Sequence, residues 1–220
     1  VCYAIFFQWL SQGLGRFYGC DSEQQIALVS TVGFGFVVAV AVSSMFWGIA
    51  MLLSGEHLWM QWLWYLPPLV FSYAWYELNL RIANAEMLPK LYGYISASKA
   101  GLGLSLGVIF YLYFGLHGVF LGLIMSAILP PICWMRSRWR IQSPQAVDKQ
   151  MFRKILAYGL PLALTVTLTL VVDVSDRFII TALLDAEQAG LYAASYDLVV
   201  QTMGFFVAAF YLSTFPRLVK

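Results

Sequence analysis

The sequence predicts an all-α membrane protein, a multi-pass bundle of apolar transmembrane helices. Hydrophobic residues make up 61% of the 220 residues and charged residues only 11%, whereas a soluble domain usually carries about 25% charged residues. The mean hydropathy of +0.75 agrees, and apolar runs of the length needed to cross a bilayer, about 20 residues, recur along the chain. A soluble globule and a disordered chain are therefore excluded, and nothing in the charge distribution suggests a nucleic-acid partner.

Six complete spans and one partial span are predicted from these runs. Residues 1–10 are too short to cross a bilayer and look like the end of a helix whose start is missing, so we expect the chain to be a fragment of a longer membrane protein. Pro67 and Pro68 are expected to kink the second complete span. The complete spans are predicted at residues 26–53, 59–80, 92–114, 119–135, 152–184 and 191–215.

Small residues recur on one face of the span at 92–114. Ser96, Ala100, Gly103 and Gly107 follow one another at steps of four, three and four residues. Without large side chains the backbones of two helices can approach closely in lipid, so this face predicts tight packing against a neighbouring helix.

The lysines and arginines orient the spans. Twelve of the thirteen fall on one side of the membrane, if Lys99 reaches back to its helix end as an interfacial anchor. The connections on the opposite side, at 54–57, 115–118 and 185–190, contain none. Because cytoplasmic loops carry the excess of basic residues, the basic side is predicted to be cytoplasmic. The exception is Arg177, which lies inside a predicted span.

The stretch Leu156–Leu198 holds the ionisable residues Asp173, Asp176 and Arg177 inside an apolar run. Each costs roughly 2.5–3.5 kcal/mol at the centre of a bilayer, so something must offset that cost. Asp173 and Arg177 have the i, i+4 spacing of an intrahelical ion pair, and such a pair could do no more than fix helix packing. These charges belong to a polar stripe that recurs every four residues: Thr165, Thr169, Asp173, Arg177 and Thr181. Alternatively, this stripe lines a hydrated cavity in which Arg177 faces an anionic group of a substrate, while the surplus carboxylate takes a cation or a proton.

Two further residues are candidates for the same cavity. Arg16, in the segment Gly13–Tyr18, is either an interfacial arginine or a phosphate ligand, since a guanidinium group can bind phosphate oxygens through two N–H groups. Asp197 lies early in the last span, with Tyr196 beside it, and either faces the cavity or is an exposed acid near a helix end.

We find no catalytic constellation, metal site or cofactor motif in the sequence. Cys2, Cys20 and Cys133 are scattered and odd in number, and His57 and His117 have no partner at metal-binding or catalytic spacing. No loop exceeds about 15 residues, which leaves little room for a catalytic insertion.

Two adjacent segments give the chain a resemblance to a known family. They are Ser175–Ile180, with the sequence SDRFII, and Leu183–Ala193, with the sequence LLDAEQAGLYA. Three further passages fit in the same order along the chain: QWL at 8–10 with RFY at 16–18, the connection at 81–92, and GVFLG at 118–122. Together they resemble the Wzx-type oligosaccharide and polysaccharide flippases of the multidrug/oligosaccharidyl-lipid/polysaccharide exporter superfamily.

The resemblance implies a MATE-like fold of about 12 to 14 helices in two bundles around a central cavity. Residues 1–140 would belong to the N-terminal bundle, 141–150 to a cytoplasmic inter-bundle linker, and 151–220 to the first two helices of the C-terminal bundle. The implied cargo is an undecaprenyl-pyrophosphate-linked oligosaccharide for surface polysaccharide or O-antigen, moved to the outer leaflet of the bacterial inner membrane without a cofactor. Implied partners are membrane lipid and other polysaccharide-assembly membrane proteins.

For the candidate residues, the resemblance implies that Arg177 and Arg16 contact the pyrophosphate, with Asp173, Asp176 and Asp197 beside them. Two alternatives stay open. One is a cation-coupled MATE-type exporter of drugs or metabolites, which would depend more on the carboxylates. The other is a membrane polysaccharide polymerase or glycosyltransferase, which would need a large loop bearing paired acids or arginines.

Overall fold

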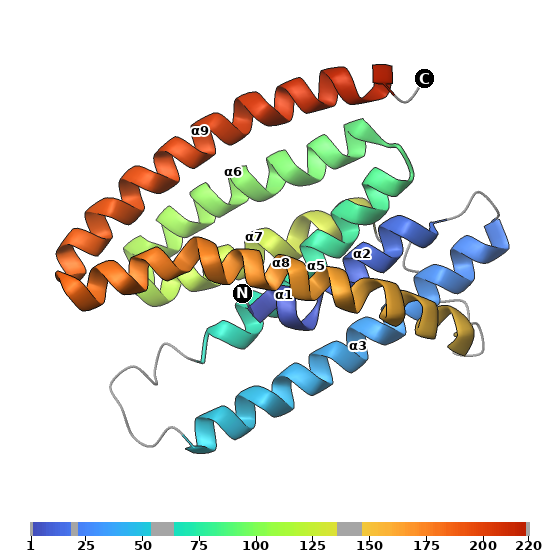
Figure 1. Cartoon of the computed structure of the whole chain (residues 1–220), viewed down its shortest axis with the longest axis horizontal. Helices are drawn as coiled ribbons and strands as arrows, with labels where there is room; N and C mark the ends of the chain where they lie inside the picture. Colours follow the sequence, from blue (N-terminus) through green and yellow to red (C-terminus); the bar gives the residue numbers. More distant parts are fainter. Residues whose placement is uncertain (1, 19–21, 54–63, 136–146, 219–220) are drawn as a thin grey trace. The chain divides into compact units, whose positions relative to one another are not determined.

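The structure is a computed structural model, and it describes residues 2–18, 22–53, 64–135 and 147–218. Helices are the only regular elements in these residues. The prediction of an all-α helical membrane bundle is confirmed. In chain order the helices are α1 (Cys2–Phe6), α2 (Gln8–Phe17), α3 (Ser22–Leu53), α5 (Leu66–Ala85), α6 (Pro89–Phe114), α7 (Leu116–Met135), α8 (Lys149–Leu183) and α9 (Ala186–Leu218) (Figure 1).

Within the described residues, α3, α6, α7 and α8 are long and apolar enough to cross a membrane. The predicted kink at Pro67 and Pro68 is wrong. Both prolines stand in the first turn of α5, where a missing N–H group breaks no hydrogen bond and the fixed φ suits a helix start. The predicted loop 54–57, the start of the second span and the arginines at 136, 138 and 140 lie outside the described residues.

The chain divides into two compact units, Val1–Thr167 and Leu168–Lys220, and the boundary falls inside α8. The first unit contains α1 to α7 and the beginning of α8, and the second contains the rest of α8 with α9. The predicted inter-bundle linker at 141–150 lies largely outside the described residues and remains a prediction.

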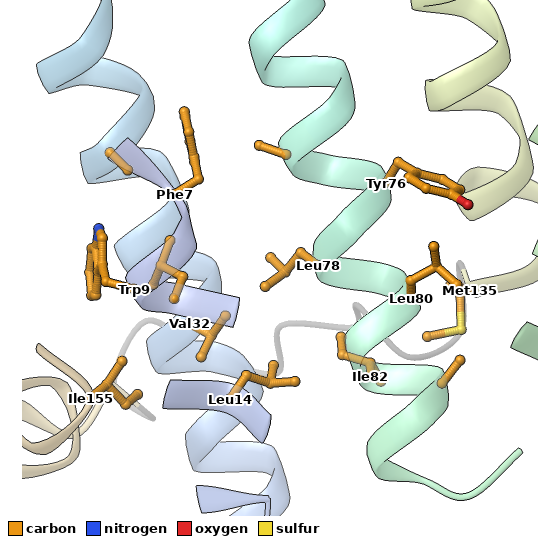
Figure 2. Packing of buried hydrophobic residues seen from close by; sticks show 14 of the residues in the cluster. Phe7, Trp9, Leu14, Val32, Tyr76, Leu78, Leu80, Ile82, Met135 and Ile155 are labelled. Atoms are coloured by element: carbon orange, nitrogen blue, oxygen red, sulfur yellow. The ribbon is translucent and has the colours of Figure 1, made fainter. Parts of the chain in front are cut away.

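Aromatic and aliphatic side chains from six helices, α2, α3, α5, α6, α7 and α8, form the core of the first unit (Figure 2). Phe7 lies between Phe36 of α3 and Phe71 of α5, with ring centroids 5.4 and 6.0 Å away. Ile155 of α8 is fully buried in the same cluster and lies next to Gly13 of α2. This core anchors the first part of α8 to the first unit.

Close packing of α6 on α7 confirms part of the predicted small-residue face. A Cβ atom placed on Gly122 of α7 would lie 2.7 Å from the backbone nitrogen of Gly107 of α6, and one on Gly103 would lie 3.5 Å from the Ser126 hydroxyl. The turn between these helices is at Gly115, whose φ of +60° suits glycine. The other two residues of the face differ, because Ser96 binds Tyr76 of α5 and Ala100 is exposed.

The outer faces of the apolar helices carry large hydrophobic side chains. On α6, Leu104 and Leu112 are each 75% exposed. A soluble protein rarely exposes so much contiguous apolar surface, whereas lipid tails cover it at no cost. These faces agree with a bundle that sits in a bilayer.

Candidate functional site

The predicted polar residues at the end of α8 meet α9 in a helical hairpin of the second unit. The break is short because Asp185 caps α9: its side-chain Oδ1 accepts a 2.7 Å hydrogen bond from the backbone N–H of Gln188. An acidic residue followed three positions later by Gln is a helix-start pattern, and it lets α9 begin at Ala186, five residues before the predicted span. The hairpin therefore brings residues about 16 to 20 positions apart into contact.

Arg177 pairs with Asp197 across this hairpin. Its Nη2 atom donates to Asp197 Oδ1 at 2.5 Å, and the side chains are 32% and 51% exposed. The guanidinium carbon also lies 5.9 Å from the ring centroid of Tyr196. The Nε atom of Arg177 is buried and has no hydrogen-bond partner within the described residues. Arg177 is thus held in place by two contacts and keeps a donor for a further acceptor.

Asp176 forms a second link between the two helices. Its Oδ2 atom accepts a 2.6 Å hydrogen bond from the Tyr192 hydroxyl, and its Oδ1 accepts one from the backbone N–H of Arg177. The Tyr192 ring stacks on that of Tyr196, with centroids 5.8 Å apart. Two carboxylates, two tyrosines and one arginine therefore form a connected group, which we call the hairpin cluster.

Asp173 and Arg16 are not part of the hairpin cluster. Asp173 is exposed on α8, and the described residues show no contact between it and Arg177. The intrahelical ion pair that the spacing allowed is therefore replaced by a pair with α9. Arg16 is exposed in the last turn of α2, in the first unit.

The position of Arg177 along α8 is also informative. It lies six residues before the last residue of the helix, which corresponds to about 9 Å along the axis. The hairpin cluster is thus near the end of α8 that the charge pattern predicts to lie outside, and a charge near a helix end costs less to bury than one at the bilayer centre.

Lys99 is a charged residue that the sequence interpretation placed wrongly as an interfacial anchor. It lies near the middle of α6, and its ammonium nitrogen is 4.2 Å from the ring centroid of Tyr76 and 4.8 Å from that of Tyr73, both on α5. The carboxylate of Glu77 attracts it electrostatically, but the described residues form no ion pair with it. The sequence contained a pattern that indicates this site: Tyr73, Tyr76 and Glu77 are spaced so that they share one face of a helix.

Further hydrogen bonds extend from these tyrosines. The Tyr76 hydroxyl lies 3.2 Å from the Ser96 hydroxyl, and Tyr73 stands one turn before Glu77 on α5. The rings of Tyr73 and Tyr3 pack at nearly a right angle, with centroids 5.1 Å apart. The Tyr3 hydroxyl lies 3.1 Å from that of Ser11. The first unit therefore holds its own group of polar residues around an internal cation. Within the described residues no three metal-ligating side chains gather in one place.

A comparison with protein families matches residues 16–220 of the chain to the family described as "Polysaccharide biosynthesis protein". The match covers the first unit from residue 16 onward, the whole second unit and every residue of the hairpin cluster. Comparisons with curated proteins and with solved structures return no match.

Proposed function

The chain belongs to the polysaccharide biosynthesis protein family, and on that premise we propose that it forms part of a membrane flippase. The cargo is an oligosaccharide linked through pyrophosphate to undecaprenol, which the protein moves from the cytoplasmic to the outer leaflet by alternating access. The product serves surface polysaccharide or O-antigen assembly in the bacterial inner membrane. The protein rearranges itself around the cargo and breaks no covalent bond.

The observation that carries this proposal is the state of Arg177. An arginine within a membrane helix is costly unless its charge is compensated. Asp197 compensates it through Nη2, yet Nε is left buried and without a partner among the described residues. A phosphate oxygen is the acceptor that such a guanidinium group binds best, because its N–H groups match the spacing of phosphate oxygens.

Asp197 then acts as the resident counter-ion that the pyrophosphate displaces or joins. The pair is only partly buried, so a second anion can approach it. Arg16 and Lys99, on the first unit, are further candidates for contacts with the anionic head group. Asp176 orients the backbone next to Arg177 through its hydrogen bond to that N–H.

Substitution of Arg177 in the whole protein tests the proposal. In a strain that lacks the chromosomal copy, Arg177→Ala should leave the protein in the membrane, abolish surface polysaccharide and let the lipid-linked precursor accumulate on the cytoplasmic side. Arg177→Lys should restore only part of the activity, since an ammonium group lacks the planar pair of donors. Arg153→Ala is the matched control, because Arg153 is an exposed arginine in the first turns of the same helix. Normal polysaccharide in Arg177→Ala would contradict the role of Arg177.

The surplus of carboxylates favours a second candidate, a cation-coupled exporter of drugs or metabolites. Asp173, Asp176 and Asp197 outnumber the single arginine near them, and Asp173 is exposed without a basic partner in the described residues. In that case Asp173→Asn should remove drug resistance and leave surface glycans unchanged. Loss of glycans without a change in drug resistance would speak for the flippase.

A further inference from the structure

An apolar pocket lies where the start of α6 meets the end of α7. Its volume is about 420 Å³, within the range of about 300–1,000 Å³ that ligand pockets span. Its walls are apolar and are formed by Leu88, Pro89, Lys90, Leu91, Tyr94 and Trp134. The rings of Tyr94 and Trp134 stack with centroids 5.3 Å apart, and both side chains remain about half exposed.

The pocket lies at a membrane–water boundary. Both α6 and α7 are candidate spans, and the pocket is at the ends of these helices opposite their Gly115 turn. Exposed tyrosine and tryptophan at helix ends are typical of the layer where lipid head groups meet hydrocarbon. The lysine and arginine count assigns this end to the cytoplasmic leaflet.

Lys90 supplies a positive charge at the rim of the pocket. It is exposed, and the described residues offer it no hydrogen bond or ion pair. Its aliphatic stem lines the apolar wall, so its ammonium group is free to extend toward the head-group layer. An apolar cavity next to a cation that no described residue neutralises, at a cytoplasmic membrane boundary, has the chemistry of an acidic-lipid site.

We propose that this pocket binds one acidic phospholipid of the cytoplasmic leaflet. An acyl chain fills the apolar cavity between Leu91 and Trp134, and the phosphate group binds the Lys90 ammonium. Free phosphate would leave the apolar walls uncovered, and a zwitterionic lipid would bring no net charge to Lys90. The inference is independent of the cargo that the protein transports.

Quenching of Trp134 fluorescence by brominated lipids tests this site. The whole protein is reconstituted in phosphatidylcholine vesicles that contain a fixed fraction of dibrominated phosphatidylglycerol or, in parallel, dibrominated phosphatidylcholine. The Trp134 signal is taken as the difference between the wild type and Trp134→Phe, which keeps an aromatic ring at that position. We expect the acidic lipid to be preferred about fivefold, the effect of one lysine near an anionic lipid.

Variants of Lys90 separate this site from general attraction to a charged surface. Lys90→Gln should remove the preference, and Lys90→Arg should keep it. Lys149→Gln changes an exposed lysine at the start of α8, away from the pocket, and should leave the preference intact. Equal quenching by the two lipids in the wild type, or an equal loss in Lys149→Gln, would overturn the proposal. So would displacement of the acidic lipid by undecaprenyl phosphate at low concentration, because the occupant would then be a polyprenyl chain.

Discussion

At the scale of single residues, the hairpin cluster depends on side chains that reach from one helix to the next. Tyr192 and Tyr196 stand one turn apart on α9 and stack on each other. Of their two hydroxyl groups, only that of Tyr192 has a partner among the described residues, the Asp176 carboxylate at 2.6 Å. The aromatic contact and the hydrogen bond can therefore be separated by experiment.

Tyr192→Phe should lower the melting temperature of the whole protein in detergent more than Tyr196→Phe does. The first change removes a hydrogen bond to a carboxylate and the second removes a hydroxyl that binds no described residue, while both keep the stacked rings. Thermal unfolding followed by circular dichroism measures the difference. A larger effect of Tyr196→Phe would mean that Asp176 does not join α8 to α9 through Tyr192.

Lys99 allows a second prediction at this scale. Lys99→Met should keep or raise the thermal stability, because it replaces a half-buried ammonium that has no ion pair among the described residues with an apolar chain of similar length. It should also reduce transport if the cation contributes to cargo binding. Lys154→Met, at an exposed position near the start of α8, is the control and should change neither property. Normal transport in Lys99→Met would limit Lys99 to a packing role.

At the scale of helices, the close approach of α6 and α7 is the contact most sensitive to added volume. Gly122→Ala would bring a methyl group to 2.7–2.9 Å from the backbone of Leu106 and Gly107, which cannot move without separating the helices. We expect a loss of about 1–3 kcal/mol in the free energy of unfolding. Gly101→Ala is the matched control, because a Cβ there meets nothing within 4 Å, and it should be neutral or stabilising by about 0.5–1 kcal/mol. Unfolding of the two variants in mixed micelles provides the comparison.

The helices could largely be predicted from the sequence, because long apolar runs predict membrane helices. Four of the six predicted spans, now α3, α6, α7 and α8, are long and apolar enough to cross a membrane within the described residues. The pattern also located Gly103 and Gly107 on the face toward α7, since small residues at helical spacing mark a packed face whatever the partner. The sequence pattern could not identify the ion-pair partner of Arg177. Asp173 and Asp197 both carry a carboxylate that could pair with Arg177. The short turn that Asp185 caps sets the register of α8 against α9, and this register brings Asp197 to Arg177.

The environment of the Lys99 side chain could likewise not be predicted from the sequence. Lysine can extend toward water from most positions near a helix end, so composition alone favoured an anchor. Its actual environment depends on α5, whose Tyr73 and Tyr76 present their ring faces to the ammonium. Attraction between a cation and aromatic rings is a tertiary effect that a single-helix pattern does not encode.

At the scale of the whole molecule, the charge pattern makes a prediction about orientation. Asp185 in the connection between α8 and α9 and Glu187 in the first turn of α9 are acidic, and the connection holds no basic residue. The start of α8, in contrast, carries Lys149, Arg153 and Lys154. Cytoplasmic loops hold the excess of lysine and arginine, so the α8–α9 turn should face outward and the start of α8 should face the cytoplasm.

Cysteine labelling in intact cells tests this orientation. In a background without Cys2, Cys20 and Cys133, Glu187→Cys should react with a membrane-impermeant maleimide added outside. Gln150→Cys, at an exposed position in the first turn of α8, should react only after the membrane is permeabilised. The reverse pattern would place the hairpin cluster at the cytoplasmic end. Arg177 would then meet the pyrophosphate when the cargo enters rather than before its release, which changes the step that Arg177→Ala should block.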